Sequence, residues 1–389
     1  MGKIIVYGMG TIGKMIAKML TTLNLDFILV DGNPNLWGQF LFGKKIVPSI
    51  ELKGFLNEEN LLVVCIRDDQ EEAFVEYCRR YVKVETWQHF VSKLVAQYEN
   101  VVGVTYTTDF KTNFKKWWFG LKEEIEFWEE SYAKPEACKH DWYIKLVNNK
   151  KFYDAFFDMS IIKSGWKIID VGSGIVSRYG EKIDNGEIEL TSVDPLAPWY
   201  NKFNKKYNKE YCKKEVRFGL LEELSEQFQD NSIDMVIISN ALDHCIDPFR
   251  CIEESLKVIK VGGYLYIKTL IRESCNEKAI GLHQWNLDTN ENNEFIIWNT
   301  NSFINVSKEL KGTCEIVINR YPADERGLSG NWGFMTIYII KQDNKGLKNG
   351  YKAVKLTDSC YDIFSRIAET ENYRDDMLWK EGYETVVKK

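Results

Sequence analysis

Short apolar runs alternate with amphipathic stretches along most of this 389-residue chain. In the first part, apolar strands are expected at residues 3–7, 26–31 and 60–68, and residues 14–22 between the first two have helical spacing. Strands that alternate with helices predict a parallel sheet with helical crossovers. We therefore expect a small doubly wound α/β module over residues 1–97.

Aromatic and apolar residues recur every three or four positions in the next segment, which is the period of one helix face. This face comprises Phe114, Trp117, Leu121, Ile125, Trp128 and Tyr132. Pro135 marks a break between two helices. We expect residues 98–157 to form a helical connector that packs its aromatic side chains on the next domain. The alternative is that part of this face closes over a substrate.

A second alternating pattern begins at Trp166. Its strands are expected to end at Asp170, Asp194, Gly219, Ser239 and Thr269, with late strands at 314–320 and 334–341. This pattern predicts a seven-stranded doubly wound sheet over residues 158–342, with an antiparallel finish. Residues 343–389 form a polar tail with a weak helical pattern around 358–368. The expected architecture is thus two Rossmann-like doubly wound sheets joined by a helical connector.

Composition narrows the class of protein. A hydrophobic content of 44% with 28% charged residues is typical of a soluble globular protein. The net charge of -6 gives no indication of nucleic-acid binding. No apolar run approaches the roughly 20 residues that span a bilayer, so we expect no membrane span and a cytoplasmic location. Nine cysteines without a CxxC pair predict reduced thiols instead of disulfides or a zinc site.

The segment KIIDVGSGIVSRYG, residues 167–180, opens a glycine turn at the end of a strand. Doubly wound sheets bind ligands beyond the carboxyl ends of their strands, where glycine lets the backbone approach the ligand. Gly172 and Gly174 supply this approach, and Asp170 faces the same crevice. Asp194 closes the next strand, where an acid accepts hydrogen bonds from ribose hydroxyls. These residues fit a dinucleotide and a nucleoside methyl donor equally well.

Two later segments, NSIDMVIISNALDHCIDP and ESLKVIKVGGYLYIKT, follow this turn. In that order they resemble the class I S-adenosylmethionine-dependent methyltransferases, over roughly residues 160–342. The stretches DVGSG, SVDPLA, NALDHCIDP and GLHQW are similar to a bacterial subgroup associated with the methylation of surface polysaccharides and related small molecules.

The resemblance implies S-adenosylmethionine as the cofactor and assigns its binding residues. Asp170, Gly172 and Gly174 would line its methionine portion, Asp194 would hold its ribose, and Asn240 would lie beside its sulfonium. Two departures stand out. Val176 replaces the usual third glycine, and Leu220 and Leu221 stand where relatives place an acid that holds the adenine amine. Adenine recognition is therefore expected to use backbone groups, or the affinity is expected to be modest.

His244 and His283 lie in loops after the expected fourth and fifth strands, at the carboxyl edge of the sheet. A hydroxyl acceptor needs a base, and an imidazole with a pKa near about 6.5 is suited to that role. We expect His283 to be this base, because GLHQWN places Gln284 and Trp285 beside it as polar and aromatic surfaces for a sugar. His244 is expected to pack under the donor or to hold its loop through Asp243.

The acids next to His244 allow further readings. Asp243 and Asp247 can orient His244 or ligate a divalent ion, and Asp247 also fits the N-cap of a helix that opens at Pro248. We assign no metal. The remaining histidines, His89 and His140, are expected to be structural or exposed.

The chain contains an earlier glycine turn, GMGTIG, between the first strand and the first helix. Gly8, Gly10, Gly13 and Asp31 satisfy the dinucleotide-binding pattern. The following segment, DGNPNLWGQFLFGKKIVPSIEL, resembles a small Rossmann-like module of bacterial glycan-biosynthesis proteins. Related modules in such proteins bind a nucleotide-sugar. Three roles stay open for this module: nucleotide or nucleotide-sugar docking, a structural or oligomerising role, and NAD(P) binding.

These patterns lead to one functional hypothesis and two rivals. The hypothesis is an O-methyltransferase that acts on a small molecule, a sugar or a nucleotide-linked sugar, in bacterial glycan biosynthesis. The first rival is an NAD(P)-dependent oxidoreductase that uses the first glycine turn. The second is a catalytically silent binding or assembly protein.

Overall fold

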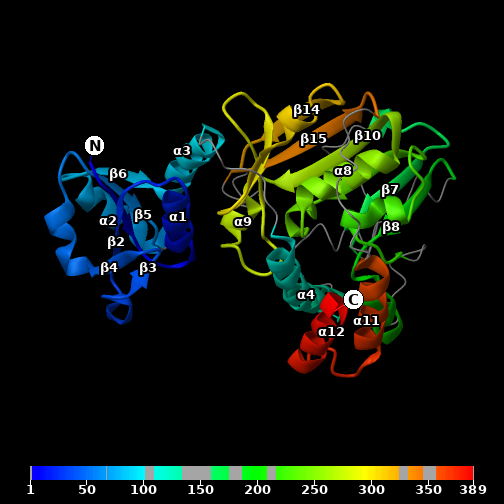
Figure 1. Cartoon of the computed structure of the whole chain (residues 1–389), viewed down its shortest axis with the longest axis horizontal. Helices are drawn as coiled ribbons and strands as arrows, with labels where there is room; N and C mark the ends of the chain where they lie inside the picture. The colour runs from blue at the N-terminus through cyan, green and yellow to red at the C-terminus, as the bar shows by residue number, and fades with distance from the viewer. Residues whose placement is uncertain are drawn as a thin grey trace. The chain divides into compact units, whose positions relative to one another are not determined.

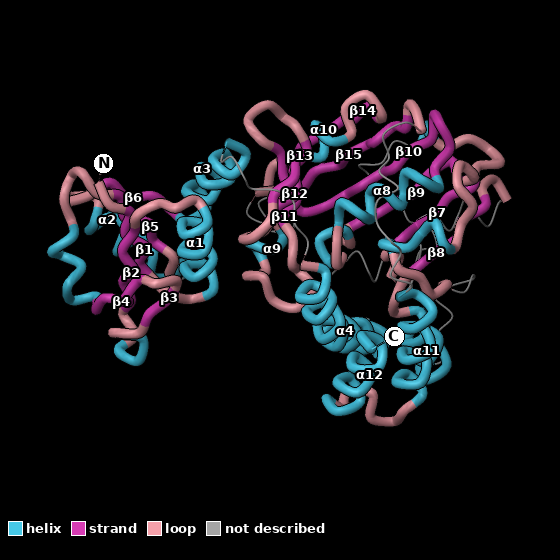
Figure 2. Tube along the Cα trace, viewed as in Figure 1, coloured by secondary structure: helices cyan, strands magenta, loops and turns pink. Residues whose placement is uncertain are grey.

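The computed structural model describes residues 2–66, 68–100, 109–133, 159–174, 186–207, 216–323, 332–344 and 356–388. The chain divides into two compact units, residues 1–107 with 289–305, and residues 108–288 with 306–389. Figures 1 and 2 label the elements of both. His140, Val176, Pro135 and the second half of the expected connector lie outside the described residues. No helix among the described residues is long and apolar enough to cross a membrane.

The first unit is an α/β module. Its elements are β1 (Ile4–Tyr7), α1 (Thr11–Thr22), β2 (Phe27–Asp31), η1 (Pro34–Leu36), β3 (Phe40–Leu41), β4 (Lys44–Pro48), η2 (Ser49–Phe55), β5 (Leu61–Val64), α2 (Asp68–Cys78), β6 (Lys83–Thr86), α3 (Trp87–Asn100), β12 (Phe295–Trp298) and β13 (Phe303–Asn305). The order of its main sheet is β3-β4-β2-β1-β5-β6, and only β3 pairs in the antiparallel sense. The three strands expected from the apolar runs are confirmed.

The first unit also recruits a segment that is distant in sequence. Strands β12 and β13 form an antiparallel pair, and residues 289–305 group with residues 1–107. Thr22 Oγ1 and Tyr98 Oη each donate to the carbonyl of Thr300 at 3.4 Å. The expected boundaries at residues 97 and 342 do not anticipate this return of the chain.

The second unit contains the second sheet and a group of helices. Its elements are α4 (Phe110–Ala133), η4 (Met159–Ile161), β7 (Lys167–Val171), β8 (Glu189–Val193), α7 (Ala197–Tyr207), η5 (Leu221–Glu226), β9 (Ile233–Ser239), η6 (Leu242–His244), α8 (Pro248–Val258), β10 (Ile259–Leu270), α9 (Glu273–Asn276), β11 (Asn286–Thr289), α10 (Val306–Glu309), β14 (Cys314–Tyr321), β15 (Phe334–Lys341), α11 (Leu356–Glu369) and α12 (Asp376–Lys388). The sheet order is β14-β15-β10-β9-β7-β8, with β15 antiparallel to both β10 and β14.

The described sheet has six strands where seven were expected. At the place of the seventh, Arg217 makes a single parallel bridge to Val193. The chain passes Gly219 and enters η5 at Leu221, so this segment leaves the sheet before it can form a regular ladder. The antiparallel finish of the sheet is confirmed.

Helices α4, α7, α11 and α12 of the second unit share one aromatic core. Trp118 of α4 is fully buried against Phe364 of α11 and Trp379 of α12, and its Nε1 donates to the carbonyl of Trp379 at 2.8 Å. The aromatic face predicted for α4 is therefore a packing face. The polar tail, for which only a weak helix was expected, supplies two helices of this core.

The cysteines behave as the sequence predicts within the described part of the chain. Seven are free thiols, and six of these are buried. Burial raises the pKa of the Cys360 and Cys251 thiols, which keeps them protonated at neutral pH.

Candidate active site

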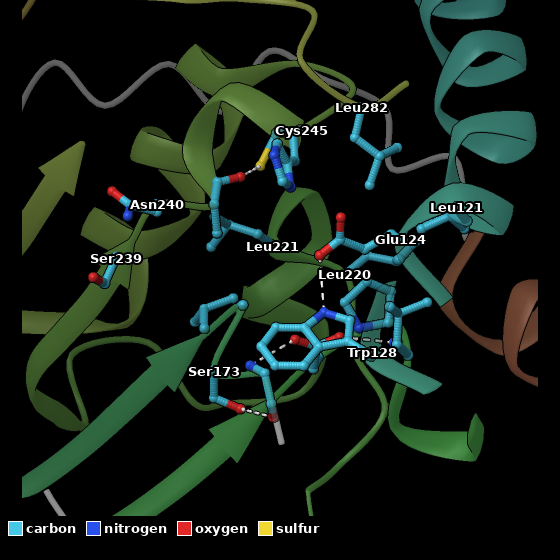
Figure 3. Close-up of a pocket in the computed structure, with 18 of the residues that line it drawn as sticks. Leu121, Glu124, Trp128, Ser173, Leu220, Leu221, Ser239, Asn240, Cys245 and Leu282 are labelled. Atoms are coloured by element: carbon cyan, nitrogen blue, oxygen red, sulfur yellow. Dashed lines mark hydrogen bonds between the residues drawn. The ribbon is translucent and has the colours of Figure 1, made fainter. Parts of the chain in front are cut away.

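A cavity of about 200 Å³ lies beyond the carboxyl ends of β7, β8 and β9. This is the edge at which doubly wound sheets bind their ligands. Its polar wall includes Asp170, Ser173, Asp194, Ser239 and Asn240, and its apolar wall includes Leu121, Leu196, Leu220, Leu221 and Leu282 (Figure 3). The division into a polar and an apolar wall suits a nucleoside with a charged amino-acid tail.

The glycine turn after β7 is held by Asp194. Gly172 and Gly174 have φ of +63° and +65°, which L side chains rarely adopt. Gly174 N donates to Asp194 Oδ2 at 3.0 Å, and Leu196 N donates to Asp194 Oδ1 at 2.8 Å. Burial raises the pKa of the Asp194 carboxyl to about 7, although these backbone bonds oppose the shift.

Helix α4 covers this turn. A Cβ added to Gly174 would lie 3.1 Å from the indole ring of Trp128, so Trp128 packs directly on the turn. Trp128 Nε1 donates to Glu124 Oε1 at 2.8 Å, one helical turn earlier (Figure 3). One end of the predicted aromatic face thus closes the cavity, as the alternative reading of that face proposed.

One acid lies just after the expected third strand, next to the two leucines. Leu220 and Leu221 line the cavity, as the sequence indicates, and the next residue, Glu222, lines it too. Glu222 is buried, and its Oε1 accepts the Ile246 N–H at 2.7 Å. Burial raises the pKa of this carboxyl. Glu222 therefore supports the loop after β9 from beneath the cavity wall.

A second cavity of about 380 Å³ adjoins the first. Glu124, Phe127, Asn240 and His244 line both. Asp243, Leu270, Glu273, Glu277 and His283 complete the second cavity. The two cavities therefore join at these four residues.

Asp243 and two imidazoles form one cluster in the second cavity. His283 Nδ1 lies 2.8 Å from Asp243 Oδ2 and 3.2 Å from His244 Nε2. His244 Nε2 is 3.5 Å from the same carboxylate oxygen. The Asp243 side chain is only 2% exposed, whereas His244 and His283 are 20% and 27% exposed. Asp243 therefore orients His283 from behind, in preference to His244.

The charges in this cluster displace several pKa values. Although burial by itself would lower the pKa of His283, the hydrogen bond and the negative charge of Asp243 raise it to about 9. Burial opposes ionisation of Asp243, but the two imidazoles hold its pKa below the ordinary value. Burial and the charge of Asp243 raise the pKa of Glu273 to about 7.

Two groups of side chains have donor atoms close enough for a metal ion. They are Asp243, His244 and His283, and Glu222, Cys245 and Cys251. We assign no metal to either; hydrogen bonds join His283 to Asp243 and His244 in the first group.

The structure brings most of the expected site residues together. Asp170, Gly172, Gly174, Asp194 and Asn240 line the first cavity, and Asp243, His244 and His283 line the second. Asp247 caps α8 by accepting the Arg250 N–H at 3.0 Å, as expected. Trp285 does not face the acceptor side, because it is fully buried and its Nε1 donates to the Cys245 carbonyl. His89 is exposed on α3.

The cavity residues that the sequence did not single out include Glu124, Phe127, Glu273 and Glu277. Glu124 has a readable signal, because it stands four positions before Trp128 on the predicted helix. Glu273 and Glu277 lie in and just after the short helix α9, where no periodicity points to a site.

The first glycine turn has its own geometry in the first unit. A Cβ at Gly13 would lie 1.8 Å from the Gly8 carbonyl oxygen, so that glycine is required for helix packing. A Cβ at Gly10 would meet nothing within 4 Å. Asp31 accepts the backbone N–H groups of Met9 and Asn33. The Asp31 carboxylate therefore supports the turn.

Residues 169–267 match the family model described as a methyltransferase domain. The match runs from β7 into β10 and includes Asp170, Gly172, Gly174, Asp194 and Asn240. The match supports the predicted enzyme class, a methyltransferase that uses S-adenosylmethionine as its cofactor. The match includes neither the first glycine turn nor α4.

Curated proteins are similar in sequence to parts of this chain. The ubiquinone biosynthesis O-methyltransferase of Pseudomonas fluorescens Pf0-1 is 29% identical over 160 residues, 38% of this chain and 64% of that protein. The malonyl-[acyl-carrier protein] O-methyltransferase of Marinomonas sp. MWYL1 is 31% identical over 117 residues, 28% of this chain and 40% of that protein. The similarity thus spans less than two thirds of either relative.

One similar solved structure is the 1,6-didemethyltoxoflavin-N1-methyltransferase of Burkholderia thailandensis, with bound 1,6-didemethyltoxoflavin and S-adenosylhomocysteine. It is 14% identical, and the similarity covers 58% of this chain and 88% of that chain with a TM-score of 0.34.

Replacement of Asp194 tests the cofactor cavity. Asp194→Ala removes the carboxylate that holds the glycine turn, and we expect S-adenosylmethionine binding to weaken by about 2 to 4 kcal/mol. Isothermal titration calorimetry measures the loss, and circular dichroism checks that the variant stays folded. The exposed Asp362→Ala on α11 is the matched control. Unchanged binding in a folded Asp194→Ala variant would refute the assignment.

Proposed function

We propose that this protein transfers a methyl group from S-adenosylmethionine to a hydroxyl group of a small hydroxylated molecule such as a sugar. The observation that carries the proposal is the pair of adjoining cavities. The first has the residues that suit the methyl donor, and the second has an imidazole oriented by a buried carboxylate.

The first cavity fits the donor in its residues. Asp170 would bind the amino-acid end, Asn240 would lie beside the sulfonium, and Asp194 would hold the ribose side while it supports the glycine turn. When bound, S-adenosylmethionine supplies a methyl group on a positively charged sulfur, which keeps the electron pair of the broken carbon–sulfur bond. Glu124, Phe127, Asn240 and His244 stand where the two cavities meet, and they would exclude water from the reacting atoms.

His283 is the proposed proton acceptor. Its Nδ1 is oriented by Asp243, which leaves Nε2 to take the proton of the acceptor hydroxyl as the new carbon–oxygen bond forms. Oxygen is favoured over nitrogen because an unaided alcohol needs such a base and because both curated relatives named above are O-methyltransferases. The sugar and the link to bacterial glycan biosynthesis rest on the sequence resemblance.

Removal of the His283 imidazole tests this role. His283→Ala should lower the turnover rate roughly a hundredfold or more while the affinity for S-adenosylmethionine stays unchanged, as expected for loss of a general base. Single-turnover methyl transfer and donor titration measure the two quantities. The exposed His89→Ala is the control. If His244→Ala abolishes turnover and His283→Ala does not, the two histidines have exchanged roles.

The pH dependence of turnover gives a second test. Because the pKa of His283 is raised to about 9, its imidazole is mostly protonated at pH 7, and the form that accepts a proton increases as the pH rises. We expect turnover to increase about tenfold per pH unit from pH 7 and to level off near pH 9. The charged groups that face His283 are Asp243 and His244 on η6, Glu273 and Glu277 at α9, and Glu124 on α4.

A substitution at Asp243 tests whether His283 causes this pH dependence of turnover. Asp243→Asn removes the carboxylate that raises the pKa of His283, so the midpoint of the profile should move to lower pH, toward the ordinary value of 6.5. Stopped assays at fixed ionic strength measure it. A midpoint that stays near pH 9 in this variant would contradict the assignment of His283.

For the first unit we propose nucleotide or nucleotide-sugar docking at the GMGTIG turn. The supporting observation is the open space at Gly10, beside the uncapped start of α1, which has no acidic residue in its first turn. NAD(P) has weaker support, because the matched methyltransferase domain supplies a different chemistry.

Gly10→Val should block this docking. Because a side chain at Gly10 meets no protein atoms, the change should alter stability by about 0.5 kcal/mol or less and leave S-adenosylmethionine binding intact. Calorimetry of the full chain with UDP-glucose, and with NAD as the competing probe, measures the effect. If the wild-type chain binds neither probe at millimolar concentration, the docking role is wrong and a structural role replaces it.

A further inference from the structure

The second cavity has an unusual distribution of charge. Four of its nine lining residues are carboxylates, Glu124, Asp243, Glu273 and Glu277, and they come from three places in the chain: α4, η6 and the α9 region. Among the described residues that line it there is no lysine or arginine. The imidazoles of His244 and His283 also line it, at 3.5 Å and 2.8 Å from a carboxylate oxygen of Asp243.

The other three carboxylates form no ion pair with a described residue, although the positive charge of His283 acts on Glu273 and Glu277. Glu124 accepts one hydrogen bond from Trp128, and Glu273 accepts one from Asn276 Nδ2 at 3.3 Å. Glu277 is exposed at the end of α9. Neighbouring like charges in a partly buried site repel one another unless a cation lies between them. Burial and then the negative charge of Asp243 raise the pKa of Glu273.

An aromatic ring lies beside these acids. Phe127 of α4 is 39% exposed and lines both cavities. A ring face beside carboxylates is an arrangement that binds ammonium groups, because the ring attracts the cation and carboxylates neutralise it. A phosphate or a carboxylate in the same place would face three negative groups.

We propose that the acceptor carries a positively charged amine, which Glu124, Glu273 and Glu277 bind beside the ring of Phe127. This inference rests on the proposed function, since it assigns the second cavity to the methyl acceptor. A protonated amine has no lone pair with which to attack a methyl group. The amine is thus an anchor, and a neighbouring hydroxyl is the group that faces His283. The proposal selects amino sugars and amino alcohols over phosphorylated or nucleotide-linked sugars as acceptors.

Glucose and two derivatives, each changed at one position, test the proposal on the full chain. Glucosamine carries an ammonium at C2 and glucose 6-phosphate a phosphate at C6, where glucose carries hydroxyls. Calorimetry with the protein saturated with S-adenosylhomocysteine should show glucosamine binding about tenfold or more tighter than glucose, with no measurable binding of glucose 6-phosphate.

Substitutions of two lining glutamates test whether the second cavity causes the preference for glucosamine. Glu277→Gln and Glu124→Gln should each reduce the preference for glucosamine over glucose by about tenfold. Glu277 is exposed, so its replacement leaves the core intact. Glu130→Gln, an exposed position on α4 that lines neither cavity, is the matched control and should retain the full preference.

Each outcome decides the proposal. Equal affinity for glucosamine and glucose, tighter binding of glucose 6-phosphate, no glucosamine binding at tens of millimolar, or a preference that survives in both glutamate variants would overturn it. The same titrations without S-adenosylhomocysteine, together with a separate titration of S-adenosylmethionine, show whether donor binding itself fails. A failure of the proposed function is thereby distinguished from a failure of this inference.

Discussion

The packing of Trp128 on the glycine turn after β7 bounds the first cavity of the second unit. Helix α4 is held in this place by its aromatic core, in which Trp118 is buried against Phe364 and Trp379. A helix has a period of 3.6 residues, so one face can enter an aromatic core while Glu124 and Phe127 face the cavities. The tail helices α11 and α12 are therefore part of the support of the active site, although they lie far from it in sequence.

Buried carboxylates are the second constraint, and each one described here has a partner that offsets its loss of hydration. Asp194 accepts two backbone N–H groups, Glu222 accepts the backbone of the loop after β9, and Asp243 pairs with two imidazoles. Leaving a buried charge unpaired costs several kcal/mol, so each of these acids binds together two segments of the carboxyl edge. The edge is consequently rigid where the donor is expected and more open at Glu273 and Glu277, where the acceptor is expected.

The two glycine turns show how similar sequences acquire different surroundings. Each follows a buried strand, and each is held by the acid that ends the next strand, Asp31 in the first unit and Asp194 in the second. At Gly174 the space beside the turn is bounded by Trp128, whereas at Gly10 it is open. A wall of side chains makes the second turn part of an enclosed cavity, and the first turn has no such wall at Gly10.

Local patterns in the sequence were enough to predict most of the sheet strands, the helix α4, the glycine turns and the acids at the strand ends, and the family resemblance supplied the class of enzyme. They succeed because periodicity, glycine spacing and polar residues at the ends of apolar runs act over a few neighbouring residues. The tertiary structure alone decided that His283 pairs with Asp243, 40 residues away, that residues 289–305 return to the first unit, and that Glu124, Glu273 and Glu277 surround one cavity. These relations depend on which side chains meet when distant elements pack, and no local period records that contact.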